Sequence, residues 1–527
     1  MLRALVRLAI GIPAAALLSL AAPSLAQEIT LGQGAAVTSI DPHFHNLATN
    51  IKLSIHMFDR LVDQDERMRP IPGLATEWKT IDDTTWEFKL RPGVKFHDGS
   101  DLSAEDVAAT IRRVNWVPNS PSPFTIYTRQ IKEIIVVDPQ TIRFKTSTPY
   151  PLMPVDLASI YIVSRKFEQA PTSAFNDGSA MIGSGPFKYA SYAQGDRIVV
   201  QRNDAYWGAK PHWQKATIKI ITNNAARVAA LLAGDVQAID DVPPADYVAL
   251  KANANVSLVR ALANSVLFIH MDSFRDKTPF VTDKAGQPLA ANPFKDRRVR
   301  MAISKAINRQ ALVERVMDGT ATPAGGLLAE GFFGVSPKLK PDAYDPDGAR
   351  KLLAEAGYPN GFAITIHGPN DRYPNDDKVL QALAPMLTRI GIDTKVVAQP
   401  WTIFIGQASA PTYAYSLLLI GNSATTGEAS FPLRAQVATV SSEKGMGASN
   451  RARYSNPKVD EVLDRALATV DDKKREALLQ ETAEIAMADQ ALVPLFYQDN
   501  TYALRKGLAY TGRADGYMAA FMIRPGN

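Results

Sequence analysis

The sequence predicts an α/β fold of two lobes, and three observations support this prediction. The 527 residues are enough for two or three hydrophobic cores. Strand and helix patterns alternate along the chain, without an internal repeat or a low-complexity segment. A strand-like run near the C-terminus, 492–497, is expected to return to the first half of the chain. At least two strands would then cross between the lobes, which permits hinge closure over a cleft.

Local signals in the first half fit this fold class. Residues 86–90 alternate between apolar and charged side chains, which is typical of a half-buried strand. Ser103 and Asp106 form a capping box that begins a helix. Residues 217–239 show the order strand, helix, strand, with Gly234 ending the helix, and this is the pattern of an α/β layer.

The second half repeats the alternation. Asp296 precedes apolar residues at helical spacing and predicts one long helix over 297–312. A strand is predicted over 362–367, and Gly391 separates a later helix from the strand 392–397.

These patterns suggest a division of the chain. We expect residues 27–270 and 498–527 to form lobe I, and residues 271–497 to form lobe II. The segment 273–293 is polar and broken by Pro and Gly, so it predicts an excursion close to a crossover.

The N-terminus predicts a secreted protein. Arg3 and Arg7 flank the start of an apolar stretch, 8–20, that is short for a membrane span. Residues 24–26 offer a cleavage site between small residues, so we expect a signal peptide over 1–26. The chain has no Cys, which excludes a lipid anchor on Cys, disulfides and thiol chemistry. We therefore expect a monomer that is free in a periplasm.

Charge and motifs exclude several classes of protein. The net charge of +5 is spread without a Lys/Arg run, so a nucleic-acid partner is not expected. No Gly-Lys pair, GxSxG or HExxH occurs. The SxxK at 441–444 has no KTG after it, and we interpret it as a loop. No enzymatic activity, cofactor or catalytic residue is predicted.

His43 and His45 would share one face of a strand and are the candidate ligands of a metal site. Asp41 is the only carboxylate nearby in the sequence, and a metal needs further ligands. We favour a loop at the cleft over a metal site.

Several segments, in a fixed order, are similar to a known family. They are Ile71–Ala75 with Trp78, Leu90–Gly99 with Leu102–Val107, Gly183–Phe187, Asn203–Trp207, Asp296–Arg300 with Ala302, and Ala349–Leu353 with Ala356 and Gly357. Together they resemble the extracellular solute-binding proteins of family 5, which serve peptide, nickel and opine ABC importers. The resemblance covers nearly the whole chain after the predicted signal peptide.

This resemblance implies a two-lobed periplasmic binding protein of type II that engulfs a small-molecule ligand. It also implies an extra β-rich subdomain in lobe I, at about 52–180, and an architectural role for the segment 90–107. The implied partners are a membrane permease and cytoplasmic ATPase subunits.

The resemblance also suggests where the ligand binds. Dipeptide-binding members use an Arg for the ligand carboxylate, and Arg372, followed by Tyr373, lies after a second-lobe strand where that Arg occurs. Arginine suits this role because its planar fork meets a carboxylate with two hydrogen bonds. Trp401 begins the helix after the strand 392–397, where family members place an aromatic residue beside the ligand.

One segment departs from the family. Dipeptide-binding members hold the ligand ammonium with an Asp after a buried strand, but here the loop 421–428 contains no Asp. Asn422 and Glu428 are the only residues that could take this role. In the first lobe, Ser39 and His45 follow the first strand, at the edge where α/β crevices collect ligands.

The favoured function is therefore capture of a peptide or peptide-like zwitterion for an ABC importer. An oligosaccharide, an opine or a metal chelate remains an alternative ligand for the same fold. A secreted α/β hydrolase is a more remote alternative.

Overall fold

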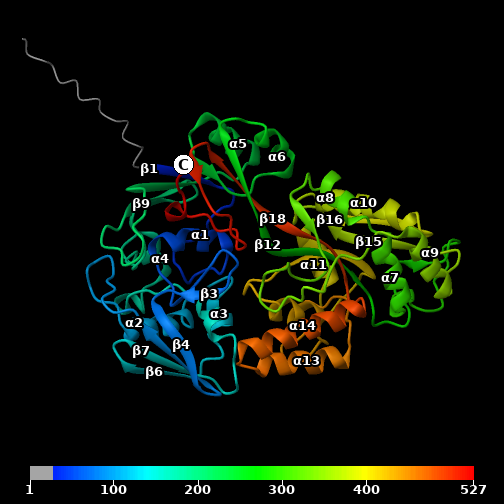
Figure 1. Ribbon diagram of the computed structural model, residues 1–527, viewed down its shortest axis with the longest axis horizontal. Helices are drawn as coiled ribbons and strands as arrows, with labels where there is room; N and C mark the ends of the chain where they lie inside the picture. The colour runs from blue at the N-terminus through cyan, green and yellow to red at the C-terminus, as the bar shows by residue number, and fades with distance from the viewer. Residues whose placement is uncertain (1–27, 527) are drawn as a thin grey trace, which may run out of the picture.

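The computed structural model describes residues 28–526, so the predicted signal peptide lies outside the described residues. Figure 1 shows two lobes joined near the centre of the molecule. Within the described range, no helix has the length and apolar character that a membrane span requires.

One sheet of 12 strands extends through both lobes. Its strands are β1 (Glu28–Gln33), β8 (Phe187–Ala193), β9 (Arg197–Arg202), β10 (Lys215–Ile220), β11 (Ala238–Ile239), β12 (Val256–Met271), β13 (Val281–Thr282), β14 (Ala321–Pro323), β15 (Phe362–Pro369), β16 (Ile392–Gln399), β17 (Leu417–Ser423) and β18 (Val493–Arg505). The order is β13-β15-β17-β12-β18-β11-β1-β10-β9-β8, with β16 paired to β15 and β14 paired to β18.

The first lobe is built around β1, which pairs in parallel with β10 and β11. Its helices are α1 (Ala48–Met57), α3 (Met153–Leu157), α4 (Thr172–Asn176), α5 (Asn224–Ala233) and α6 (Pro244–Lys251). The predicted strand, helix and strand over 217–239 are present as β10, α5 and β11. Gly234 ends α5 with a φ of +88°, a left-handed conformation that Gly adopts without a Cβ clash.

A separate antiparallel sheet forms a β-rich subdomain at the far end of the first lobe (Figure 1). Its strands, in spatial order, are β4 (Ala75–Asp82), β5 (Thr85–Leu90), β7 (Thr141–Lys145) and β6 (Glu133–Asp138), and α2 (Ala104–Val114) packs beside them. The predicted capping box begins α2, because the Ser103 N–H donates to the Asp106 carboxylate at 2.9 Å. A short hairpin of β2 (Val62–Gln64) and β3 (Pro70–Pro72) lies closer to the second lobe.

The second lobe has a parallel centre, in which β15 pairs with β16 and β17. Its helices are α7 (Arg297–Ala306), α8 (Arg309–Arg315), α9 (Pro346–Glu355), α10 (Asp376–Thr388), α11 (Trp401–Ala408), α12 (Ser430–Pro432), α13 (Pro457–Ala468) and α14 (Asp472–Ala488). The prediction of one long helix over 297–312 was wrong. Ile307 is extended, and the Asn308 side chain accepts the Ala311 N–H at 2.9 Å, which starts a second helix.

Two long strands connect the lobes, as the sequence predicted. β12 and β18 pair with each other in antiparallel fashion, while β12 also pairs with β17 and β18 also pairs with β11. The returning strand is longer than the predicted 492–497. The ladder between the two strands is interrupted between Leu262 and Val266, where the register shifts. Residues 263–265 therefore interrupt the ladder where the two lobes meet.

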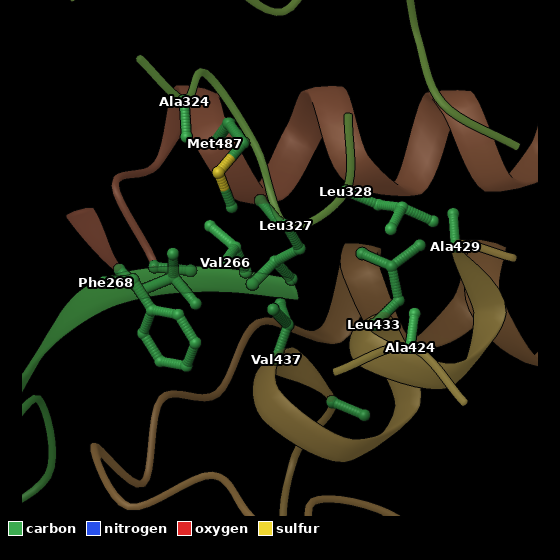
Figure 2. Close-up of a cluster of buried hydrophobic side chains, with 14 of the residues drawn as sticks. Val266, Phe268, Ala324, Leu327, Leu328, Ala424, Ala429, Leu433, Val437 and Met487 are labelled. Carbon is green, nitrogen blue, oxygen red and sulfur yellow. The ribbon is translucent and has the colours of Figure 1, made fainter. Parts of the chain in front are cut away.

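The crossover strands also belong to the hydrophobic core of the second lobe. In Figure 2, Val266 and Phe268 of β12 point into a cluster that contains Leu327, Leu433 and Met487. The crossovers are thus fixed by apolar burial at the second-lobe end as well as by their hydrogen bonds.

A fully buried ion pair holds the loop after β1. Arg113 of α2 lies 2.7 Å from the Asp41 carboxylate, and both side chains have no exposed surface. Burial opposes ionisation of Asp41, but the hydrogen bond and charge of Arg113 outweigh it, so the pKa of Asp41 is lower than usual.

Replacing Arg113 should therefore destabilise the protein strongly. We expect Arg113→Met to lower the free energy of unfolding by about 3–5 kcal/mol, because it leaves Asp41 buried without its partner. The neighbouring Arg112 is the matched control, since its ion pair with Glu168 is half exposed. Arg112→Met should cost less than about 1 kcal/mol in the same urea unfolding measurement. Equal losses in the two variants would contradict this account.

Candidate ligand-binding site

A cavity of about 390 Å³, called here the hinge cavity, lies between the lobes beside the crossover strands. Thr49 and Lys52 of α1 and Tyr517 of the C-terminal segment line it from the first lobe. Ser265 of β12 and Ser423 of β17 line it at the junction with the second lobe. The cavity therefore lies where hinge closure would bring the two lobes around a ligand.

The charged side chains on the first-lobe wall of the hinge cavity do not all have equally close partners of opposite charge. Lys52 Nζ lies 2.5 Å from Asp240 and 3.5 Å from Asp241. Burial disfavours the ammonium of Lys52, but the two carboxylates outweigh burial and raise its pKa. Asp241 keeps 57% of its side chain exposed and has a φ of +51°. Its carboxylate has room for a second cation, and its left-handed backbone is the kind of strain found at functional sites.

A tyrosine hydroxyl is a further polar group at the hinge cavity. Tyr161 lines the hinge cavity, is buried, and its hydroxyl has no hydrogen-bond partner among residues 28–526. An unpaired buried hydroxyl costs free energy unless a ligand or water bonds to it. Tyr161 can therefore donate to or accept from a polar ligand group.

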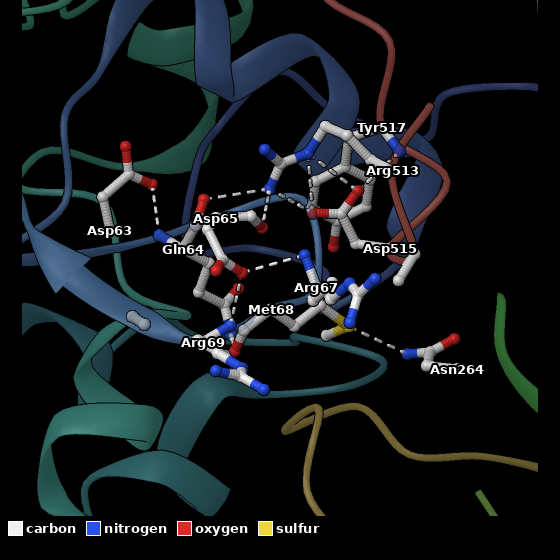
Figure 3. A network of polar contacts seen from close by, with 12 residues as sticks. Asp63, Gln64, Asp65, Arg67, Met68, Arg69, Asn264, Arg513, Asp515 and Tyr517 are labelled. Atoms are coloured by element: carbon white, nitrogen blue, oxygen red, sulfur yellow. Dashed lines mark hydrogen bonds and ion pairs between the residues drawn. The ribbon is translucent and has the colours of Figure 1, made fainter. Parts of the chain in front are cut away.

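Figure 3 shows how the C-terminal segment holds the β2–β3 hairpin at this site. The Arg513 guanidinium donates to the carbonyl oxygens of Gln64 and Asp65 at 3.1 and 3.0 Å. It also forms a buried ion pair with Asp515 at 2.7 Å. At the hairpin tip, the Met68 sulfur accepts a contact from Asn264 Nδ2 at 3.4 Å.

Three residues predicted from the sequence come together on the second lobe. The Arg372 guanidinium carbon lies 5.1 Å from the centre of the Trp401 ring, and the Tyr373 and Trp401 rings meet edge to face at 6.1 Å. Arg372 is exposed and forms no ion pair with a carboxylate in the described part of the chain. Its guanidinium is therefore available to an anion.

The predicted Asn422 lies next to this group. The Tyr373 hydroxyl accepts the N–H of Gly421 at 2.9 Å, and the Asn422 side-chain oxygen accepts from Gln436 at the same distance. Asn422 Nδ2 is buried and has no partner in the described range. Ser423, the next residue along the chain, lines the hinge cavity, whereas Arg372, Tyr373, Trp401 and Asn422 are absent from its lining.

Glu428 is separate from these residues. It is buried, and both of its carboxylate oxygens lie 2.9 Å from Arg475 Nη1. Its charge is therefore already matched within the second lobe.

Ser39 and His45 also use their polar groups internally. The Ser39 hydroxyl donates to Asn176 at 2.9 Å and accepts the Asp41 N–H at 3.1 Å. His45 Nδ1 lies 3.0 Å from the Thr38 hydroxyl. The loop after β1 reaches the hinge cavity through Asn46, next to His45.

Asp241 and Tyr161, the first-lobe residues with the clearest unmatched polar groups, were not predicted from the sequence. Only the pair of Asp residues before Pro243 and Pro244 could have drawn attention to this position. For metal binding, residues 28–526 contain no cluster of three or more candidate ligands.

The fold and the cleft define a two-lobed solute-binding protein. A model of the bacterial extracellular solute-binding proteins, family 5 Middle, matches residues 69–442. The glutathione-binding protein GsiB of Pectobacterium atrosepticum is 30% identical over 473 residues, which cover 88% of this chain and 87% of that protein. GsiB of Escherichia coli O1:K1 / APEC is 29% identical, with 95% and 94% covered. This chain belongs to family 5 of the bacterial extracellular solute-binding proteins.

Solved structures agree with this assignment of the fold. HbpA2 from Haemophilus parasuis gives a TM-score of 0.82 at 22% identity, covering 95% of this chain and all of that one. The unliganded open form of MppA, a periplasmic murein tripeptide-binding protein, gives 0.81 at 22% identity, with 95% and 98% covered. The predicted fold class is confirmed. The predicted function is confirmed as that of a solute-binding component of an ABC transporter.

A buried carboxyl group lies in the interface between the β-rich subdomain and the second lobe. Asp156 of α3 accepts a 2.5 Å hydrogen bond from the Tyr150 hydroxyl. Burial raises the pKa of Asp156 to about 7, although this hydrogen bond and the positive charge of Arg434 lower it. The folded protein thus holds a proton on Asp156 at pH values where the unfolded chain has lost it.

Asp156 should therefore make stability fall as the pH rises. Between about pH 4 and pH 7 the folded state binds more protons at this position than the unfolded state, so its stabilising effect is lost over that window. We expect the unfolding free energy of the wild type, relative to Asp156→Asn, to drop on the order of 2 kcal/mol from pH 4.5 to 7.5. The exposed Asp377→Asn should show no such difference. A flat difference for Asp156→Asn in urea titrations would contradict the raised pKa.

Proposed function

We propose that this protein captures a small peptide-like zwitterion in the hinge cavity and delivers it to the permease of an ABC importer. One observation carries the proposal. The second lobe carries a guanidinium, Arg372, that forms no ion pair with a described carboxylate, and the first-lobe wall of the hinge cavity carries the half-exposed carboxylate of Asp241. A zwitterion offers one charge to each, so closure can remove both from water with partners in place.

Arg372 receives the ligand carboxylate in this proposal. Its guanidinium lies over the Trp401 ring, which orients the planar group and leaves its edge free. The same contact covers a face of Trp401 that a sugar ring would need for stacking. The arrangement thus favours a peptide-like ligand over an oligosaccharide.

Asp241 receives the ligand ammonium. The dipeptide-type Asp is missing from the loop 421–428, and Glu428 is already paired with Arg475. Within the described part of the chain, the one ion pair of Asp241 is a long contact of 3.5 Å to Lys52. A ligand ammonium at Asp241 would complete the charge balance of this wall.

Closure would move two bodies, residues 27–270 with 498–527 and residues 271–497, about the crossover strands. The permease with its cytoplasmic ATPase subunits would recognise the closed form. Export by the signal peptide 1–26 would place the protein in the periplasm, without a lipid anchor and without catalysis. The names of the relatives, glutathione-binding and murein tripeptide-binding, support a ligand with peptide-like charges.

Removing either charge should weaken binding selectively. We expect Arg372→Ala to raise the Kd for a peptide-like ligand by roughly 30- to 700-fold, or about 2–4 kcal/mol, since a buried carboxylate loses its partner. Asp241→Asn should weaken a ligand with a free ammonium and spare its N-acetyl derivative. Calorimetry with glutathione, tripeptides, dipeptides, an opine and maltotriose provides the measurement.

The surface arginine on the same lobe, Arg389, is the control, and Arg389→Ala should leave every Kd within twofold. Tight binding of maltotriose with no response to Arg372→Ala would contradict the proposal. Failure of every ligand to bind a folded protein would also contradict it.

A further inference from the structure

A second cavity, of about 300 Å³ and called here the distal cavity, lies at the interface of the β-rich subdomain and the second lobe. Trp78 of β4 and Trp86 of β5 form one wall, with Pro154 of α3 beside them. Phe333 and Arg475 of α14 form the opposite wall. In Figure 1, α3 and α14 lie opposite each other at this interface.

The distal cavity is adjacent to the hinge cavity. Met68 lines both of them. A small cavity of about 20 Å³ lies between them; it shares Tyr127 and Thr425 with the hinge cavity and Thr426 with the distal cavity. A ligand group that extends past Met68 from the hinge cavity would therefore reach the distal cavity.

The walls of the distal cavity suit a flat apolar group. The Trp86 indole N–H is already bonded to the Tyr150 carbonyl at 2.9 Å, so its exposed ring surface is apolar. Trp78 is only partly buried, and its ring stacks on Phe88 at 6.4 Å. Aromatic rings next to proline rings bind aryl groups through large, rigid contact areas.

The buried charges of this cavity are matched, because Glu428 pairs with Arg475 at 2.9 Å and the Arg475 guanidinium lies 4.3 Å from the centre of the Phe333 ring. Arg69 and Glu476 also line the cavity and form no ion pair within the described part of the chain. The buried part of the lining therefore requires no charged ligand group. The Thr426 hydroxyl is buried and has no hydrogen-bond partner among the described residues, so one polar group of the ligand can bond to it.

We propose that the distal cavity binds an aryl group of the ligand, and that the ligand is a peptide or peptide conjugate extending beyond a dipeptide. This inference rests on the proposed function of the hinge cavity, because the charged ends of the same ligand occupy Arg372 and Asp241. The aryl group then lies between Trp78 and Phe333, and closure of the lobes removes it from water.

Paired ligands that differ only in the aryl group test the proposal. The probes are glutathione with S-benzylglutathione and triglycine with Gly-Gly-Phe and Gly-Phe-Gly, measured by calorimetry and by tryptophan fluorescence. For the wild type, the aryl ligand of at least one pair should bind 10-fold or more tightly than its parent. It should also change the tryptophan emission, and the parent should change it less.

Two variants on opposite walls separate a role in aryl binding from a role in folding. Trp78→Ala and Phe333→Ala should each reduce the aryl advantage to less than threefold and leave the Kd of the parent ligand within about twofold. Trp116, which is 44% exposed and outside the cavity linings, gives the control. Trp116→Ala should keep the full advantage. Thermal unfolding identifies any variant that fails to fold. In that case the variant on the opposite wall provides the test of aryl binding.

The outcomes distinguish this inference from the function on which it rests. Equal binding of aryl and parent ligands to the wild type, with Arg372→Ala still weakening both, would overturn the distal site alone. An aryl advantage that survives both wall variants would also overturn it. Absence of binding by all probes would overturn the proposed function and this inference together.

Discussion

The pairing of β12 with β18 is the constraint on which the rest of the structure depends. These two strands hydrogen-bond to each other along most of their length, and each also pairs with a strand of one lobe. Their ladder is broken only near 263–265 and at Leu267. Because the strands are anchored in the cores at both ends, we expect bending between the lobes to concentrate in the interrupted part. The hinge cavity lies beside this part, so the proposed closure would act directly on the walls of the cavity.

The two ends of the cleft differ in how completely their charged side chains are paired. Near the crossovers, Arg372 and Asp241 have charges that residues 28–526 do not fully match. Farther away, the Glu428–Arg475 pair is satisfied and the walls are aromatic. Burying an unmatched charge is costly, whereas burying an aromatic surface is favourable. In the proposed function, one closing movement would thus select a ligand by charge at one end of the cleft and by shape at the other.

Sequence patterns predicted the parts of the structure that depend on neighbouring residues. The capping box at Ser103 and the helix beginning at Trp401 are local, as is the alternation that indicated the fold class. The grouping of Arg372 with Trp401 followed from family resemblance. The pairing of Glu428 with Arg475 and the position of Tyr161 in the cavity could not be predicted, because they depend on how distant segments pack. The break before α8 was missed because an apolar helical spacing continued through it.

The hairpin that carries Met68 has a mechanical consequence. Met68 comes from the first-lobe side of the chain, yet it is 5% exposed and packs in the core of the second lobe. A Cβ on Gly427 would approach the Met68 Cβ to 2.4 Å, so the two backbones are in close contact. Separating them would expose the thioether to water. The lobes therefore meet at this hairpin as well as through the strands. If the contact persists during the proposed closure, two fixed points define one axis, and the lobes would rotate about that axis with little freedom to twist.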